Sequence, residues 1–131
     1  MSAPRVLIVD DNDMNIAIAQ VVLLAEKFDV ETASDGFEAI QKVASFGPDL
    51  ILMDIQMPGK DGLEVTRTLK ADPVTRHIAI VAFTAFAMRG DEAKMRAAGC
   101  DGYLTKPIDV MQFGAQVRAF LPVSPNGSIC D

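Results

Sequence analysis

The chain has 131 residues, of which 50% are hydrophobic and 23% are charged, so one globular domain can bury a core without disulfides or structural metals. The formal net charge of −6 argues against nucleic-acid binding, which needs a basic surface. No apolar run approaches the roughly 18 residues of a membrane span, and the first residues lack a signal-peptide pattern. We therefore expect a cytoplasmic protein with no membrane contact, in which Cys100 and Cys130 are free thiols.

Short apolar runs alternate with helical patterns five times along the chain. The runs predict strands at residues 5–9, 30–33, 49–53, 78–83 and 102–104. The helical patterns predict helices at residues 13–27, from Asp35 to Gly47, from Asp61 to Asp72, and at residues 87–98 and 108–121. We interpret residues 1–121 as one domain and residues 122–131, rich in Pro, Ser, Gly and Asn, as a flexible tail.

The alternation of strands and helices predicts an α/β fold with parallel strands and right-handed crossovers. Continuous apolar runs are typical of strands that helices cover on both faces. The second strand is short and alternates, which suits an edge position. We predict a flavodoxin-like (βα)5 three-layer sandwich whose five-stranded parallel sheet has the order 2-1-3-4-5.

Polar residues follow four of the predicted strands. Asp10 and Asp11 follow the first strand, Asp54 the third, Thr84 the fourth, and Lys106 comes just after the fifth. In the predicted order the first and third strands are neighbours, and the carboxyl ends of parallel strands meet at one edge of the sheet. The three acids, the hydroxyl and the lysine should therefore gather in one site.

Three carboxylates within about 5 Å of one another repel by about 3 kcal/mol per pair at an effective dielectric near 20. Such a cluster calls for a cation, and oxygen ligands completed by water suit Mg²⁺ best. The alternative for residues 10–13 alone is an acidic helix start that the helix dipole favours. That alternative does not explain why Asp54, Thr84 and Lys106 converge with them.

The chain resembles the CheY-like receiver domains of bacterial two-component signalling over residues 5–121. The resemblance rests on Asp10-Asp11, on the stretch of residues 53–62, on Thr84-Ala85 and on Lys106-Pro107, in that order. Each motif is weak alone, and the ordered set is specific.

The resemblance implies a role for each site residue. Asp54 would be the phosphoacceptor, Asp11 would bind Mg²⁺ directly, and Asp10 would bind it mainly through water. The backbone carbonyl of Gln56 would complete the protein ligands. Thr84 and Lys106 would bind oxygens of the aspartyl phosphate. Tyr103 would be an aromatic switch that responds when Thr84 moves.

The implied function is that of a single-domain response regulator. It would accept a phosphoryl group from a histidine kinase or a phosphotransfer protein on Asp54 with Mg²⁺. Because no effector domain follows residue 121, we expect output through binding of a downstream protein to the fourth helix, fifth strand and fifth helix. The chain would catalyse its own phosphorylation and dephosphorylation without turning over a separate substrate, so it is not expected to be an enzyme. Gln56 and Phe86 flank the site and are expected to set the lifetime of the phosphate.

Three alternatives stay open from the residues. A haloacid-dehalogenase-type phosphatase would use Asp11 as the phosphoacceptor, although Asn15 stands where that motif expects Thr or Val. A flavin module on the same fold would need a hydroxyl- and glycine-rich loop after the first strand, where this chain has acids. A degenerate receiver would bind its partner constitutively, but no expected site residue is missing.

Overall fold

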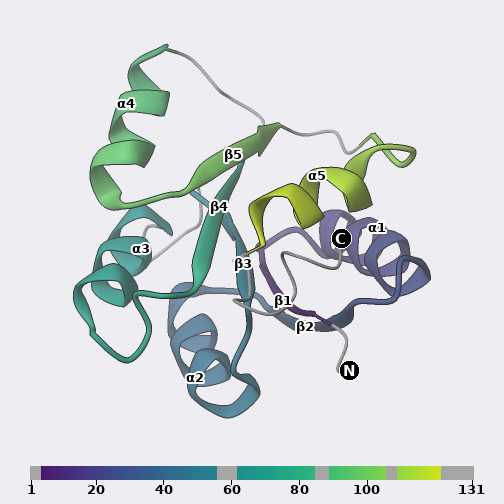
Figure 1. The fold of residues 1–131 in the computed structure, drawn as a ribbon, viewed down its shortest axis with the longest axis horizontal. Coiled ribbons are helices and arrows are strands. Elements are labelled where there is room, and N and C mark those ends of the chain that lie inside the picture. The colour runs from purple at the N-terminus through teal and green to yellow at the C-terminus, as the bar shows by residue number, and fades with distance from the viewer. Residues whose placement is uncertain (1–3, 56–61, 85–88, 106–108, 122–131) are drawn as a thin grey trace, which may run out of the picture.

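The computed structural model describes residues 4–55, 62–84, 89–105 and 109–121, and the side chains of residues 89–92 are not part of that description (Figure 1). Five parallel strands form one sheet in the order β2-β1-β3-β4-β5, which confirms the predicted topology. Their bounds are β1 (Arg5–Val9), β2 (Asp29–Ala33), β3 (Leu50–Asp54), β4 (Ala79–Thr84) and β5 (Gly102–Thr105).

Helices cover both faces of the sheet (Figure 1). Their bounds are α1 (Asp13–Ala25), α2 (Gly36–Phe46), α3 (Gly62–Ala71), α4 (Arg89–Ala98) and α5 (Phe113–Phe120). α1 and α5 pack on one face, and α2 and α3 pack on the other, where α4 lies beside α3 and β5. The three layers are those of the predicted flavodoxin-like sandwich.

Alternate side chains of each central strand enter opposite cores. Val6 and Ile8 of β1 pack beneath α1 and α5, while Leu7 and Val9 pack beneath α2 and α3. All four are fully buried, as are the corresponding residues of β3. This two-sided burial explains why these strands are continuously apolar in sequence.

The first turn of α2 follows the predicted capping pattern with one change. Asp35 accepts a hydrogen bond from the Glu38 N–H at 2.8 Å, as a helix cap does. Glu38 in return accepts from the N–H and the hydroxyl of Ser34, rather than from the N–H of Asp35. The hydrogen bond from the Ser34 backbone, followed by the one from its hydroxyl, lowers the pKa of Glu38 below its usual value. α2 ends at Gly47, whose φ of 64° is left-handed.

Two helix ends differ from the sequence-based expectation. α1 stops at Ala25, and Lys27 takes a left-handed φ of 72° before β2. α5 begins at Phe113 rather than at residue 108. A turn precedes it, in which the main-chain carbonyl of Asp109 accepts from the N–H groups of Gln112 and Phe113, and the Asp109 carboxylate accepts from Met111 N.

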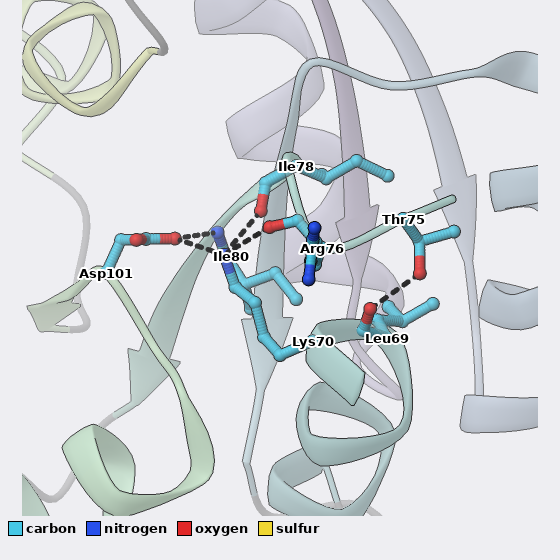
Figure 2. A network of polar contacts seen from close by, with 7 residues as sticks. All are labelled: Leu69, Lys70, Thr75, Arg76, Ile78, Ile80 and Asp101. Carbon is cyan, nitrogen blue, oxygen red and sulfur yellow. Dashed lines mark hydrogen bonds and ion pairs between the residues drawn. The ribbon is translucent and has the colours of Figure 1, made fainter. Parts of the chain in front are cut away.

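Lys70 joins the end of α3 to the connection that precedes β4 and to the residue that precedes β5 (Figure 2). Its ammonium donates to the carbonyl oxygens of Arg76 and Ile78, and to Asp101 just before β5. Asp101 accepts a second hydrogen bond from Ile80 N at 2.8 Å. These contacts fix the amino-terminal edge of β4 and β5.

Candidate functional site

The register of β1 against β3 brings the predicted acids together at the carboxyl edge of the sheet. Val9 pairs with Met53, so Asp10 and Asp54 leave neighbouring strands at the same level. Asp10 is 0% exposed and Asp54 is 4% exposed, whereas Asp11 is exposed. The site therefore has a buried floor and one solvent-facing carboxylate.

Backbone hydrogen bonds hold Asp10 in place. Its N–H donates to the carbonyl of Ala33 at the end of β2, at 3.1 Å. Its Oδ1 accepts from the N–H of Asn12 at 2.9 Å. Asn12 in turn caps α1 by accepting from the N–H groups of Met14 and Asn15. The start of α1 thus sets the orientation of the buried carboxylate.

Asp10, Asp11 and Asp54 each offer a carboxylate oxygen, and these oxygens all lie within 4.8 Å of one another. Unit charges at that separation repel by about 3 kcal/mol per pair at an effective dielectric near 20. A set of oxygen donors only, with one member facing solvent, suits a hard divalent cation that keeps part of its water shell. The residues present therefore fit Mg²⁺. The acidic-helix-start alternative accounts for Asp13 in the first turn of α1, but not for Asp54 in the cluster.

Gly62, the first residue of α3, lies against the main chain of Asp54. A Cβ atom added to Gly62 would stand 2.2 Å from the Asp54 carbonyl oxygen and 2.9 Å from the Ile55 Cα. Only glycine allows α3 to begin so close to the acid. The sequence motif contained Gly62, but its role became visible only through this contact.

Thr84 lies at the same edge of the sheet as the acids. Asp54 pairs with Phe83, so Thr84 is one residue beyond on the neighbouring strand, and it is buried. Thr84 pairs with Thr105, the last residue of β5, which Lys106 follows in the sequence. The predicted site residues Lys106, Gln56 and Phe86 lie outside the described residues.

Tyr103 on β5 is 36% exposed and borders a cavity of about 330 Å³ between α4, β5 and α5. Met95, Arg96, Cys100 and Phe120 also line this cavity. The ring of Tyr103 is therefore partly exposed beside an open volume. Among the other lining residues, burial raises the pKa of the Cys100 thiol, so this thiol stays protonated at neutral pH.

An exposed apolar stripe on α1 was not anticipated from the sequence. Its members recur at helical spacing and are all exposed: Met14, Ala17, Ile18, Val21, Leu24 and Ala25. The sequence did contain a signal for this stripe, because the helical pattern of residues 13–27 is apolar almost all round. A helix on one face of a sheet can bury only one side, so apolar residues on its other side remain exposed. The stripe begins beside the acids, since α1 starts two residues after Asp11.

Gly114 in α5 packs closely against Glu26, the residue that follows α1. A Cβ atom there would lie 2.6 Å from the Glu26 Cγ. Phe113 and Val117 of α5 are buried in the core and Phe120 packs against it, while Met111 before the helix is exposed.

The fold and site define a class of signalling protein. Residues 6–118 match the model of the response regulator receiver domain, and the chain belongs to that family. Receiver domains are parts of two-component signalling systems that act with a histidine kinase or phosphotransfer partner. The resemblance found in the motifs is thus confirmed.

Two groups of relatives refine the comparison. The chain is 43% identical over 116 residues to the polar-differentiation response regulators DivK of Brucella anthropi and Brucella ovis, over 88% of this chain and 94% of theirs. The chemotaxis response regulator CheY4 of Vibrio cholerae superposes with a TM-score of 0.86 at 26% identity, over 92% of this chain and 100% of that one. The phosphorylated cyanobacterial phytochrome response regulator RcpA gives a TM-score of 0.76 at 28% identity, over 90% of this chain and 91% of that one. Among the residues that the structure describes, no helix is both long and apolar enough to cross a membrane.

Proposed function

We propose that this chain is a phosphorylation-controlled switch that accepts a phosphoryl group on Asp54 with Mg²⁺ bound and then changes its binding to a downstream protein. The observation that carries the proposal is the convergence of the Asp10, Asp11 and Asp54 carboxylates, with the buried Thr84 on the adjacent strand. Residues 1–121 form the receiver domain in this proposal, and the protein acts in the cytoplasm. The predicted tail of residues 122–131 lies outside the described residues.

The acids divide the work of the site. Asp10 and Asp11, together with Asp54 and the carbonyl of Gln56, would hold Mg²⁺, which would supply positive charge to offset that of the transferring phosphoryl group. An oxygen of Asp54 attacks phosphorus as the bond from phosphorus to the donor histidine nitrogen breaks. Phosphoryl transfer depends mainly on alignment and charge neutralisation, so a buried and fixed carboxylate is well suited.

Thr84 and Lys106 bind oxygens of the resulting aspartyl phosphate. Phosphorylation adds between one and two negative charges and new acceptor oxygens. Thr84 turns toward them, and Tyr103 moves inward toward the cavity beside it. The face formed by α4, β5 and α5 then presents a different surface to the downstream protein. Gln56 and Phe86 set the access of water to the phosphate and hence its lifetime.

The exposed stripe of α1 supports docking of the phosphodonor. Its apolar residues begin beside Asp11, so a helix of a histidine kinase or phosphotransfer protein that packs on α1 brings its histidine toward Asp54. Transfer from such a donor, with no separate substrate turned over, distinguishes this chain from an enzyme in the usual sense.

The test uses acetyl phosphate as a small phosphodonor with Mg²⁺ and intact-mass spectrometry as the readout. The wild-type chain should gain one phosphoryl group, and the Asp54→Asn variant should gain none. Asp13→Asn is the matched control, because Asp13 lies in the first turn of α1 but outside the cluster. An adduct of full yield in Asp54→Asn that disappears in Asp11→Asn would instead support the phosphatase-type alternative.

A further inference from the structure

A second hollow lies at the opposite end of the sheet from the acids. It is a groove of about 520 Å³ between the carboxyl-terminal halves of α2 and α3 and the connection from α3 to β4. Asp49 and Ile78, which line it, immediately precede β3 and β4, whereas Asp54 ends β3. A strand of five residues separates the two sites by about 16 Å, so the groove is not part of the phosphoacceptor site.

The floor of the α2–α3 groove is apolar. Val43, Leu69 and Ile78 form it, and each also belongs to the core beneath α2 and α3. Val74 stands at the rim with 75% of its surface exposed. The volume falls within the range of roughly 300 to 1,000 Å³ that ligand sites occupy.

The rim of the groove is negative. Asp49 uses one carboxylate oxygen to accept from Arg5 N, and Asp72 uses one to accept from Val74 N. Within the described ranges, neither acid forms an ion pair, so each keeps an oxygen for a cation. The carboxyl ends of α2 and α3 already have positive partners, because the Arg5 guanidinium donates to the Phe46 carbonyl at 3.0 Å and Lys70 lies in the last turn of α3. The charge that the rim offers to a partner is therefore that of Asp49 and Asp72.

An apolar floor with charged residues at an exposed rim is the anatomy of a protein interface. Exposed carboxylates add little affinity for a small molecule that leaves them in water, but they orient a larger partner. We propose that the α2–α3 groove docks a segment of a partner protein that carries large apolar residues flanked by lysine or arginine. This docking is independent of phosphorylation at Asp54.

Two synthetic peptides of helical design serve as probes. One has leucines on one face with lysines beside them, and its twin has glutamate in place of every lysine. Binding to the full chain is measured by fluorescence anisotropy, and the site is located by amide shifts in NMR spectra. The lysine peptide should bind, should shift the amides of Ala44, Thr68 and Thr75 in the groove, and should bind the Asp54→Asn variant equally well.

The variants test the floor and the rim separately. Ala44→Trp fills the groove from an exposed position and should abolish binding, whereas Ala97→Trp on α4 should not. Asp49→Asn with Asp72→Asn keeps the acceptors for Arg5 N and Val74 N, and should weaken binding by about tenfold. Asp29→Asn with Asp109→Asn removes the same charge elsewhere and should leave binding unchanged.

Three results would overturn the proposal. They are absence of binding by the lysine peptide, equal binding of its glutamate twin, and amide shifts that fall on the exposed stripe of α1 instead of the groove. If Ala44→Trp does not fold, the charge variants and the map of amide shifts still test whether the groove binds the peptide.

Discussion

The Lys70 ammonium lies 2.9 Å from a carboxylate oxygen of Asp101 and joins the end of α3 to the start of β5 (Figure 2). Gly99, with a left-handed φ of 106°, places the turn after α4 directly over the Lys70 side chain. The amino-terminal end of β5 is thus fixed, and Asp101 itself borders the cavity beside Tyr103. Movement of α4 should be largest away from this anchor.

Lys70→Met removes the donor that serves two main-chain carbonyls and Asp101. Because these acceptors lose a charged donor in a part-buried setting, we expect a loss of about 1–3 kcal/mol in the free energy of unfolding, measured by urea denaturation. Asp101→Asn keeps an acceptor for Ile80 N and should lose less than about 1 kcal/mol. Equal losses would mean that the ion pair, rather than the carbonyl contacts, carries the stability.

Millimolar Mg²⁺ should raise the melting temperature at neutral pH, because it binds the clustered acids only in the folded chain. Asp11→Asn should melt higher than wild type in EDTA, since one repelling charge is gone, and should lose the response to Mg²⁺. Sodium chloride at matched ionic strength is the control. A wild-type melting temperature that ignores Mg²⁺ would refute the metal site.

Gly62→Ala should destabilise the chain by about 1–3 kcal/mol, because the new methyl group forces α3 away from the Asp54 carbonyl. The same shift should slow phosphorylation by acetyl phosphate, followed as adduct mass against time. Thr68→Ala on the exposed side of α3 is the control and should change neither quantity. Normal phosphorylation in a destabilised Gly62→Ala protein would show that Gly62 supports the packing of α3 but does not set the geometry of the site.

Glu38→Gln tests the cap of α2 through pH. Because the folded-state pKa of Glu38 is lowered, its stabilising effect is present above the unfolded value near 4.5 and is lost as pH falls through the folded value. The variant should melt below wild type at pH 7, and the gap should close in acid.

Tyr103→Ala should accept a phosphoryl group from acetyl phosphate at the wild-type rate but respond to it weakly. With beryllofluoride as a stable phosphate mimic, the amides of Met95 and Cys100 around the cavity should shift less than in wild type. Tyr103→Phe keeps the ring and should respond normally if ring packing is the switch. Full-sized shifts in Tyr103→Ala would contradict the switch.

The sheet was predictable because its central strands are buried on both faces and are continuously apolar in sequence, while the short, alternating second strand indicated an edge position. The cluster of Asp10, Asp11 and Asp54 followed from strand order alone, since acids at the carboxyl ends of neighbouring strands must meet. Helix ends were less predictable. Whether residue 108 begins α5 depends on how the Asp109 carboxylate and carbonyl are used, and sequence periodicity does not report this.

Contacts between elements that are far apart in the chain could not be predicted from the sequence for the same reason. Gly62 against Asp54, Gly114 against Glu26 and Lys70 against Asp101 each join residues whose approach depends on the packed positions of two elements. The α2–α3 groove is likewise a property of the space between helices. Composition can predict which residues are apolar, but not which of them remain uncovered.

The uncovered residues of α1 carry a consequence for handling the molecule. Six neighbouring apolar side chains in contact with water favour any encounter that hides them, including one between two identical molecules. Clouding or loss of material as a preparation is concentrated should therefore ease when Val21 or Ile18 is changed to a polar residue. Under the proposed docking of a helical phosphodonor on α1, such a change would also weaken recognition, so solubility and signalling place opposite demands on this surface.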